Sequence, residues 1–480
     1  MVHFVERFIF HRKILTKSTL TFSGKYIEFS QFLLKYKYHK SSKPMMLLKR
    51  LQLGLIHVAV AMTLVPIDST LNRVMIKEMS ISATLFAILS SFPYLFAPIQ
   101  VAIGSYSDRH PIFGFRRTPY ILAGLLLCVL SLVLLPPVAF LMDSNFALGV
   151  FAAVFAFGAW GMGYNLSAVS YLSLASELSG ENGRGKTIAV MWFMMIVSII
   201  LTAISLGHMV DPYTPAALIH AFQVIAAAAL TLGLIGLIKL EPRSNLVLSK
   251  PTSESYTVKQ MTDVIMSNPA AKVFFVYLLL LLVGILGQNI LLEPFAGQAF
   301  GLSVGQSTSR VNEIWGTFVL LSIIVAGLLE GRIRKKIVAQ FGNLSSLLGF
   351  IIIVISGLTA NKNTFYIGIT VLGLGTGFCT VANLSLMFDF TVPGLVGLYI
   401  GAWGFSNAIS RLTGNMLGGV VFDVLKRATG SALIGYLVVF SIEGLLLLVA
   451  ALMLNRIDVG AFQKQAHEPG FIEKVAITAE

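Results

Sequence analysis

Twelve apolar runs, each long enough to cross a membrane as a helix, dominate the chain from Leu51 onward. They lie near residues 52–76, 82–103, 118–141, 147–176, 186–208, 214–239, 271–300, 306–330, 344–360, 364–388, 395–423 and 430–455. About 20 helical residues cross a hydrocarbon core of about 30 Å. Charged residues make up only 12% of the 480, against about 25% in soluble domains. The sequence therefore predicts an all-α polytopic membrane protein with twelve transmembrane helices.

The longest polar break follows the sixth run and divides the chain into two halves of six helices. Residues 241–270 are predicted to be a cytoplasmic linker between an N-terminal half, 51–240, and a C-terminal half, 271–456. The halves resemble each other, because Gly-Met-Gly at 161–163 answers Gly-Thr-Gly at 375–377 in the corresponding helix. Two pseudo-symmetric six-helix halves in parallel are the plan of transporters of the major facilitator type.

The two ends of the chain differ from the apolar core. Residues 1–50 form a basic, aromatic extension, which is predicted to lie on an anionic membrane surface or to be disordered. A start of translation near Met45 is the alternative. The even number of helices and the basic loops place both termini, including the tail 457–480, in the cytoplasm. The net charge of +13 follows from this orientation, so membrane lipid rather than nucleic acid is the expected partner.

A charged island, Gly104–Tyr120, separates the second and third runs. Its form, G-x-x-x-D-R followed by G-x-R-R, resembles the loop between helices 2 and 3 of the major facilitator superfamily. The resemblance implies that Asp108 caps a neighbouring helix and that an arginine pair latches the two halves together. The alternative is a basic loop that only sets orientation. The candidate gating residues are Gly104, Ser107, Asp108, Arg109, Arg116 and Arg117.

Ionisable side chains within the spans are functional candidates, because each costs about 2.5–3.5 kcal/mol to insert. Arg73 in the first helix and Glu293 in the seventh are predicted to pair across a central cavity, or else to reach water at the outer interface. Arg411 and Glu443 lie at the same depth in neighbouring antiparallel helices, so a buried ion pair is predicted. The candidates for the central cavity are Asp68, Asn72, Arg73, Gln288 and Glu293.

Two histidines within the spans are candidates for binding a pigment. The imidazoles of His57 and His220 could ligate the magnesium of a chlorin, although a histidine on an apolar helix is more often a packing residue. The sequence has no H-E-x-x-H motif, no phosphate-binding glycine loop and no compact catalytic group. It therefore predicts neither a metal site nor an enzyme.

Two segments resemble a particular branch of the superfamily. PIDSTLNRVMIKEMSI at 66–81 and FPYLFAPIQVAIGSYSDRHPIFGFRRTPYIL at 92–122 are similar to PucC-type proteins, the bacteriochlorophyll delivery branch. The resemblance covers about 51–456, and Asp68, Asn72 and Arg73 are among the matching positions.

The resemblance implies a light-harvesting complex assembly factor in a bacterial cytoplasmic, chromatophore or thylakoid membrane. Its cargo would be chlorophyll or bacteriochlorophyll, and its partners light-harvesting antenna or photosystem polypeptides. The alternative is a small-solute transporter driven by an ion gradient, with Asp68, Arg73 and Glu293 as its coupling groups.

Overall fold

The computed structural model describes residues 46–179, 183–243, 268–391 and 396–466, without a few side chains, among them that of Asp108. Residues 1–50 and 51–480 are separate units, and the account below concerns the second. Most of the predicted linker 241–270 and of the tail 457–480 lies outside the described residues. The first span is Met46–Glu78. The further elements are the π-helices η1 (Pro66–Leu71) and η2 (Val74–Glu78), α3 (Ala83–Ser90), α4 (Phe92–Leu95), α5 (Ile99–Arg109), α6 (Thr118–Ser144), α7 (Phe146–Ser179), α8 (Arg184–Met209), α9 (Pro215–Leu237), α11 (Pro269–Leu286), the 3₁₀-helix η3 (Gly287–Ile290), α12 (Leu292–Phe300), α13 (Val304–Leu329), α14 (Lys335–Thr359), α15 (Lys362–Asp389), α16 (Val396–Thr429), α17 (Ala432–Leu454) and α18 (Val459–Ala466).

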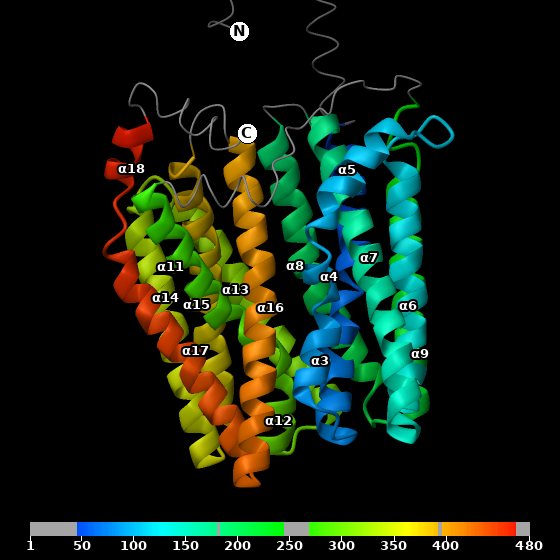
Figure 1. Ribbon diagram of the computed structural model, residues 1–480, viewed down its shortest axis with the longest axis vertical. Helices are drawn as coiled ribbons and strands as arrows, with labels where there is room; N and C mark the ends of the chain where they lie inside the picture. The colour runs from blue at the N-terminus through cyan, green and yellow to red at the C-terminus, as the bar shows by residue number, and fades with distance from the viewer. Residues whose placement is uncertain (1–45, 180–182, 244–267, 392–395, 467–480) are drawn as a thin grey trace, which may run out of the picture. The chain divides into compact units, whose positions relative to one another are not determined.

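Helices occupy all twelve predicted runs. Ten described helices are long and apolar enough to span a membrane. The other two runs are α16 and the second run, which is divided into α3, α4 and α5. Figure 1 shows the helices side by side, with α5 and α18 near the upper end and α12 at the lower end. We call these the island end and the far end.

Most helix starts follow from local sequence. Ser82, Thr214, Asn268, Ser303 and Ser431 each precede a helix and accept a hydrogen bond from a backbone N–H of its first turn. Short polar side chains at this position satisfy N–H groups that have no partner within the helix.

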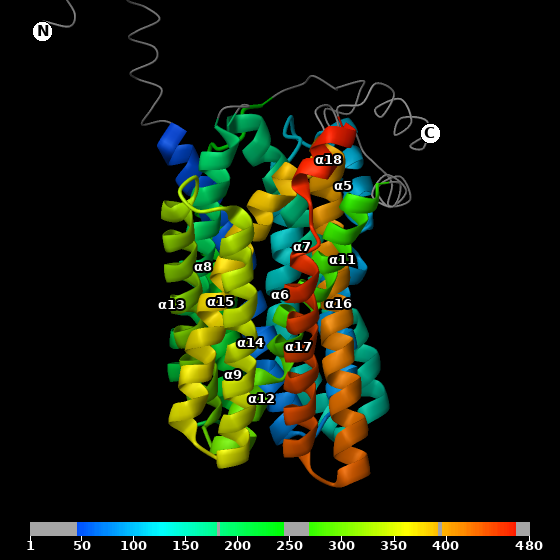
Figure 2. The same cartoon turned by 90° about the vertical axis from the view of Figure 1, so that its left-hand side faces the viewer.

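Each half contains one tightly packed pair of helices, α6 with α7 and α14 with α15. A Cβ atom on Gly163 of α7 would lie 2.6 Å from the carbonyl oxygen of Gly124 in α6. A Cβ atom on Gly377 of α15 would lie 2.5 Å from the carbonyl oxygen of Val319 in α13. The two glycine motifs therefore allow close helix packing. Figure 2 shows α13, α14 and α15 grouped in the C-terminal half.

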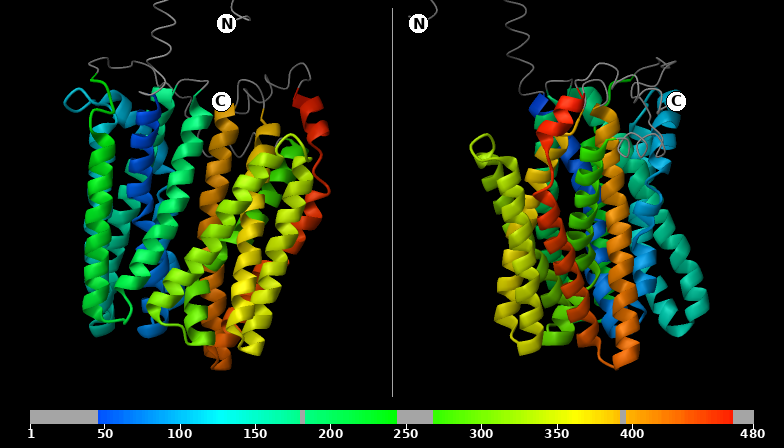
Figure 3. Two further views of the ribbon diagram at one scale, coloured as in Figure 1. Left: turned by 180° about the vertical axis from the view of Figure 1, so that it is seen from behind. Right: turned by 60° about the vertical axis from the view of Figure 1, so that its left-hand side comes forward.

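The halves meet most extensively where α8 packs on α13 and α16 packs on α3 (Figure 3). The equivalent helices 1 and 7 depart from α-helical geometry at this junction. Helix 1 continues as η1 and η2, and helix 7 passes through η3 between α11 and α12. Such irregular turns leave backbone groups to be satisfied by neighbours and are frequent at functional sites.

Candidate functional site

The irregular parts of helices 1 and 7 contact each other across the two halves. Asn72 Nδ2 donates a hydrogen bond to the carbonyl oxygen of Ile290 at 2.8 Å, and the Ser69 hydroxyl donates to Glu293 Oε1 at 2.5 Å. The predicted opposition of helices 1 and 7 is therefore present. Asn72 and Glu293 are buried in this contact.

Glu293 is held by both halves. Besides Ser69 of helix 1, Asn312 Nδ2 of α13 donates to Oε1 at 2.7 Å, and the Thr308 hydroxyl donates to Oε2 at 3.1 Å. Hydrogen bonds to a charged group contribute about 1.5–3 kcal/mol each. The carboxylate of Glu293 thus connects the two halves by hydrogen bonds near the far end.

The predicted pair between Arg73 and Glu293 is not formed. Arg73 Nη1 lies 2.7 Å from Glu78 Oε1, and Nη2 donates to the carbonyl oxygen of Leu302 at 3.3 Å. The π-helical turns change the direction of the side chains that follow them, so Arg73 points to Glu78 instead. Gln288 is also buried, and its Nε2 donates to Asn289 Oδ1 at 3.1 Å.

A central cluster lies where helix 1 meets α4, α7 and α16. It consists of Asp68, Tyr94, Tyr164 and Arg411, of which only Arg411 belongs to the C-terminal half. Arg411 Nη1 donates to the Tyr94 hydroxyl at 3.4 Å, and its guanidinium carbon lies 5.5 Å from the centre of that ring. Asp68 interacts with Arg411 electrostatically. All four side chains keep some accessible surface.

The break in the second span positions Tyr94. Asn165 of α7 donates through Nδ2 to the carbonyl oxygen of Pro93 at 2.8 Å, and its Oδ1 accepts a hydrogen bond from Gln100 Nε2. Pro98 interrupts the backbone ladder because it has no N–H. Asn165 satisfies the carbonyl group of Pro93 and so fixes α4 against α7.

The predicted ion pair between Arg411 and Glu443 is wrong. Glu443 is 0% exposed, and neither carboxyl oxygen has a hydrogen-bond partner among the described residues. It packs towards η3, where a Cβ atom on Gly287 would lie 2.7 Å from Oε1. Arg411 instead faces Tyr94 in the other half. The two side chains therefore have different neighbours.

We expect Glu443→Gln to leave stability within about 1 kcal/mol of the wild type, because no charged partner would be stranded. Glu293→Gln is the matched comparison and should cost about 2 kcal/mol or more, because its carboxylate accepts three side-chain hydrogen bonds. The measurement is the thermal unfolding midpoint of each purified variant in detergent. A larger loss for Glu443→Gln than for Glu293→Gln would contradict this assignment.

A second polar contact closes the far end. Asp423 of α16 accepts hydrogen bonds from the Ser82 hydroxyl at 2.6 Å and from the Thr84 hydroxyl at 2.7 Å and backbone N–H at 2.9 Å. The backbone N–H of Ala83 also donates to it, at 3.2 Å. The carboxylate therefore caps α3, which belongs to the other half, and is stabilised by the positive end of the helix dipole. We call this contact the far-end latch.

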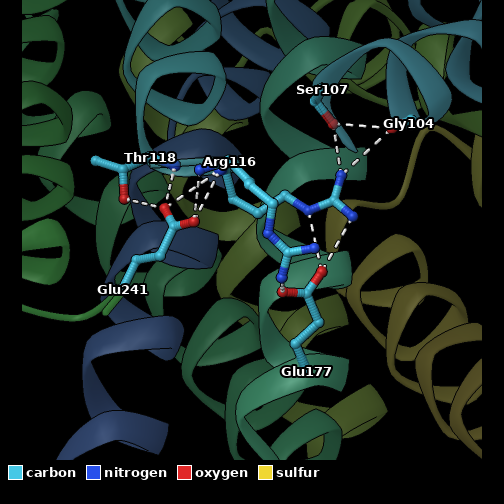
Figure 4. Close-up of polar contacts among 7 residues, drawn as sticks. Gly104, Ser107, Arg116, Thr118, Glu177 and Glu241 are labelled. Carbon is cyan, nitrogen blue, oxygen red and sulfur yellow. Dashed lines mark hydrogen bonds and ion pairs between the residues drawn. The ribbon is translucent and has the colours of Figure 1, made fainter. Parts of the chain in front are cut away.

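The charged island is built around the adjacent pair Arg116 and Arg117, as Figure 4 shows. Arg117 is 3% exposed; its Nη2 lies 3.0 Å from Glu177 Oε1, and its Nη1 donates to the Ser107 hydroxyl at 2.5 Å. Arg116 Nη2 lies 3.0 Å from Glu177 Oε2. Ser107 in turn donates to the carbonyl oxygen of Gly104 at 2.9 Å.

The same island caps α6 with a carboxylate. Glu241, just beyond α9, accepts hydrogen bonds from the backbone N–H groups of Arg116 at 2.8 Å, Arg117 at 3.0 Å and Thr118 at 2.7 Å. The partners described for the arginine pair thus belong to the N-terminal half. Arg109 ends α5 with an exposed side chain, and the predicted capping role of Asp108 falls on a side chain outside the described residues.

The C-terminal half repeats the ion pair of the island. Lys335, at the start of α14, lies 2.6 Å from Asp389 at the end of α15. Arg117 and Glu177 occupy the corresponding places at the start of α6 and near the end of α7. The pseudo-symmetry of the halves therefore extends from the glycine motifs to a charged contact.

The two candidate histidines lie in different surroundings. His57 is 7% exposed, with Nε2 3.0 Å from Met195 Sδ, and its ring contacts Tyr171 and Trp192. His220 is exposed on α9. The described residues contain no group of three or more His, Cys, Asp or Glu side chains that could hold a metal ion.

Several residues of these sites were not identified from the sequence. Glu177 and Asp389 end corresponding helices, so comparison of the two halves could have revealed them. Glu241 and Asp423 are isolated carboxylates near helix ends, which no spacing rule connects with α6 or α3. No sequence pattern marks Tyr94 as a site residue.

Comparison with known families gives one match over most of the chain. The family model described as "PUCC protein" matches residues 70–462. Protein PucC of Rhodobacter capsulatus is 30% identical over 456 residues, covering 92% of this chain and 97% of the relative. A protein of the same organism named "Bacteriochlorophyll synthase 44.5 kDa chain" is 26% identical, covering 84% and 93%.

Solved structures of transporters share the fold. The nucleoside transporter NupG superimposes with a TM-score of 0.66 at 14% identity, covering 85% of this chain and 98% of that one. An inward-facing, unoccupied bacterial homologue of the lysosomal transporter Spinster gives 0.66 at 14% identity, covering 89% and 99%. The predicted fold class, an all-helical membrane protein of the major facilitator type, is therefore confirmed.

Proposed function

We propose that this chain, which belongs to the PucC family, is an assembly factor for light-harvesting complexes that binds or delivers a chlorophyll-type pigment within the membrane. The observation that carries the proposal is the family match over residues 70–462. The relative named for bacteriochlorophyll synthase supports the link to this class of pigment. The role is proposed to be non-enzymatic, with antenna or photosystem polypeptides and pigment as partners.

The proposed orientation places the island end in the cytoplasm. Basic side chains are concentrated in cytoplasmic loops of membrane proteins, and this end carries both the island and the segment that precedes α14. The basic residues there include Arg109, Arg116, Arg117, Arg332, Arg334, Lys335 and Lys336. The far-end latch then closes the side away from the cytoplasm.

The described contacts between the halves support a closed far end. The Ser69–Glu293, Asn72–Ile290 and far-end latch hydrogen bonds join the halves at and beyond the central cluster. At the island end, the Arg117–Glu177 and Lys335–Asp389 pairs each lie within one half. A pigment would then be handled from the cytoplasmic side or from lipid.

A second candidate function is transport of a small solute driven by an ion gradient. The central cluster favours it, because Asp68 and Arg411 are ionisable groups within membrane spans that keep accessible surface. In that case the link to bacteriochlorophyll in the name of one relative would follow from movement of a soluble compound.

Deletion of the gene in its host tests the proposal. We expect antenna complexes, measured by the absorption spectrum of isolated membranes, to fall severalfold while total extractable pigment falls less. Re-expression of the wild-type chain is the control. Antenna levels equal to those of the parent strain would refute the assembly role.

A further inference from the structure

We infer that Arg411 is the anion-binding group of a ligand site in the central cluster, and that the ligand is a chlorin with a free carboxylate. This inference rests on the proposed function and names the form of the pigment. A chlorin pigment carries a propionate side chain, which is an anion in the free acid and is uncharged once it is esterified with a long alcohol. The site would therefore distinguish these two forms.

The first observation is that most of the hydrogen-bonding capacity of Arg411 is unused. A guanidinium has five N–H donors, and the described residues provide one hydrogen bond, to the Tyr94 hydroxyl at 3.4 Å. No carboxylate of the described residues lies within ion-pair distance of it. No nitrogen of Arg411 is both buried and without a hydrogen-bond partner. The side chain also keeps accessible surface. The free N–H groups are therefore open to a ligand.

The second observation is the free-energy cost of placing Arg411 in a membrane span without an ion-pair partner among the described residues. A cation within a membrane span is expensive and is normally paired. Asp68 is the acidic group that interacts electrostatically with Arg411, yet the two do not form a hydrogen bond. Asp68 thus offsets part of the positive charge of Arg411 without using its N–H donors. A ligand carboxylate can form the two parallel hydrogen bonds that arginine geometry favours.

The third observation is the composition of the surrounding walls. The rings of Tyr94 and Tyr164 reach this cluster, and both side chains are partly accessible. Tyrosine offers an apolar face to a flat macrocycle and a hydroxyl to a polar substituent. An amphipathic ring with one anionic side chain matches an aromatic wall beside a guanidinium.

Binding of two probes to the purified full-length protein in detergent tests the inference. The probes are bacteriochlorophyllide a, the free acid, and its methyl ester, which differs only by loss of the charge. We expect the wild type to bind the free acid at least tenfold more tightly than the ester, measured by quenching of protein fluorescence. This comparison needs no substitution and is unaffected by folding of variants.

Variants then assign the preference to Arg411. Arg411→Gln should reduce the affinity for the free acid about tenfold and leave the affinity for the ester within twofold. Arg411→Lys should restore part of the preference, because it keeps the charge but loses the planar fork. Arg310→Gln is the control, since Arg310 is an exposed arginine that pairs with Glu313 on α13.

The outcomes separate this inference from the proposed function. Equal binding of both probes by the wild type would overturn the inference and leave the pigment role intact. A preference that persists in Arg411→Gln would also overturn it, because another group would then hold the carboxylate. Binding of neither probe would overturn both.

Discussion

Asp423→Ala is expected to open the far end of the protein. The substitution removes one carboxylate that accepts four hydrogen bonds from the other half. A helix-capping side chain contributes about 0.5–2 kcal/mol, and each 1.4 kcal/mol changes a two-state population about tenfold. The fraction of molecules with an open far end should therefore rise by about an order of magnitude.

Spin labels on two exposed far-end positions measure this change. Ser144 ends α6 in one half, and Thr429 ends α16 in the other, and both are exposed. Pulsed electron resonance should show a longer-distance population in Asp423→Ala that is rare in the wild type. Asp143→Asn is the control, because it alters an exposed acid at the same end. An unchanged distance distribution in Asp423→Ala would show that the far-end latch does not hold the far end closed.

Arg117→Ala should destabilise the protein by about 3 kcal/mol or more. Arg117 is 3% exposed, and it bonds Glu177 and Ser107. The substitution removes this partner from polar groups of both residues, which remain partly buried. Arg116→Ala is the matched comparison, because Arg116 contacts the same Glu177 but is 18% exposed. Partly exposed ion pairs contribute about 1 kcal/mol or less.

The thermal unfolding midpoints of the two variants in detergent show whether the island is a structural core or only an orientation signal. Both substitutions remove one positive charge from the same loop, so an orientation signal alone predicts equal effects. We expect the midpoint of Arg117→Ala to fall several times further than that of Arg116→Ala. Equal midpoints would mean that the island sets topology only.

Features set by composition and repetition could be predicted from the sequence. Helix formation follows from the length of the apolar runs, since backbone groups in lipid must be satisfied within the segment. The division into two halves is a prediction from the repeated glycine motif. The double break in the second span also has a visible cause, because Pro93 and Pro98 both lie within it.

Features that depend on direction around a helix could not be predicted. Counting residues placed Arg411 and Glu443 at one depth, but the directions of their side chains depend on how α16 and α17 pack. The π-helical turns in helix 1 have the same consequence for Arg73. Contacts between halves, such as Asp423 with α3, join residues more than 300 positions apart, and local sequence does not encode such distances.

Pigment carried by the protein itself is the most direct test of the proposed role. The full-length chain would be purified in mild detergent from its native membranes, and its absorption spectrum recorded beside that of an unrelated membrane protein purified in parallel. We predict a chlorin absorption band that elutes with this protein and not with the other. A colourless protein, from membranes whose antenna complexes keep their pigment through the same detergent, would contradict the account.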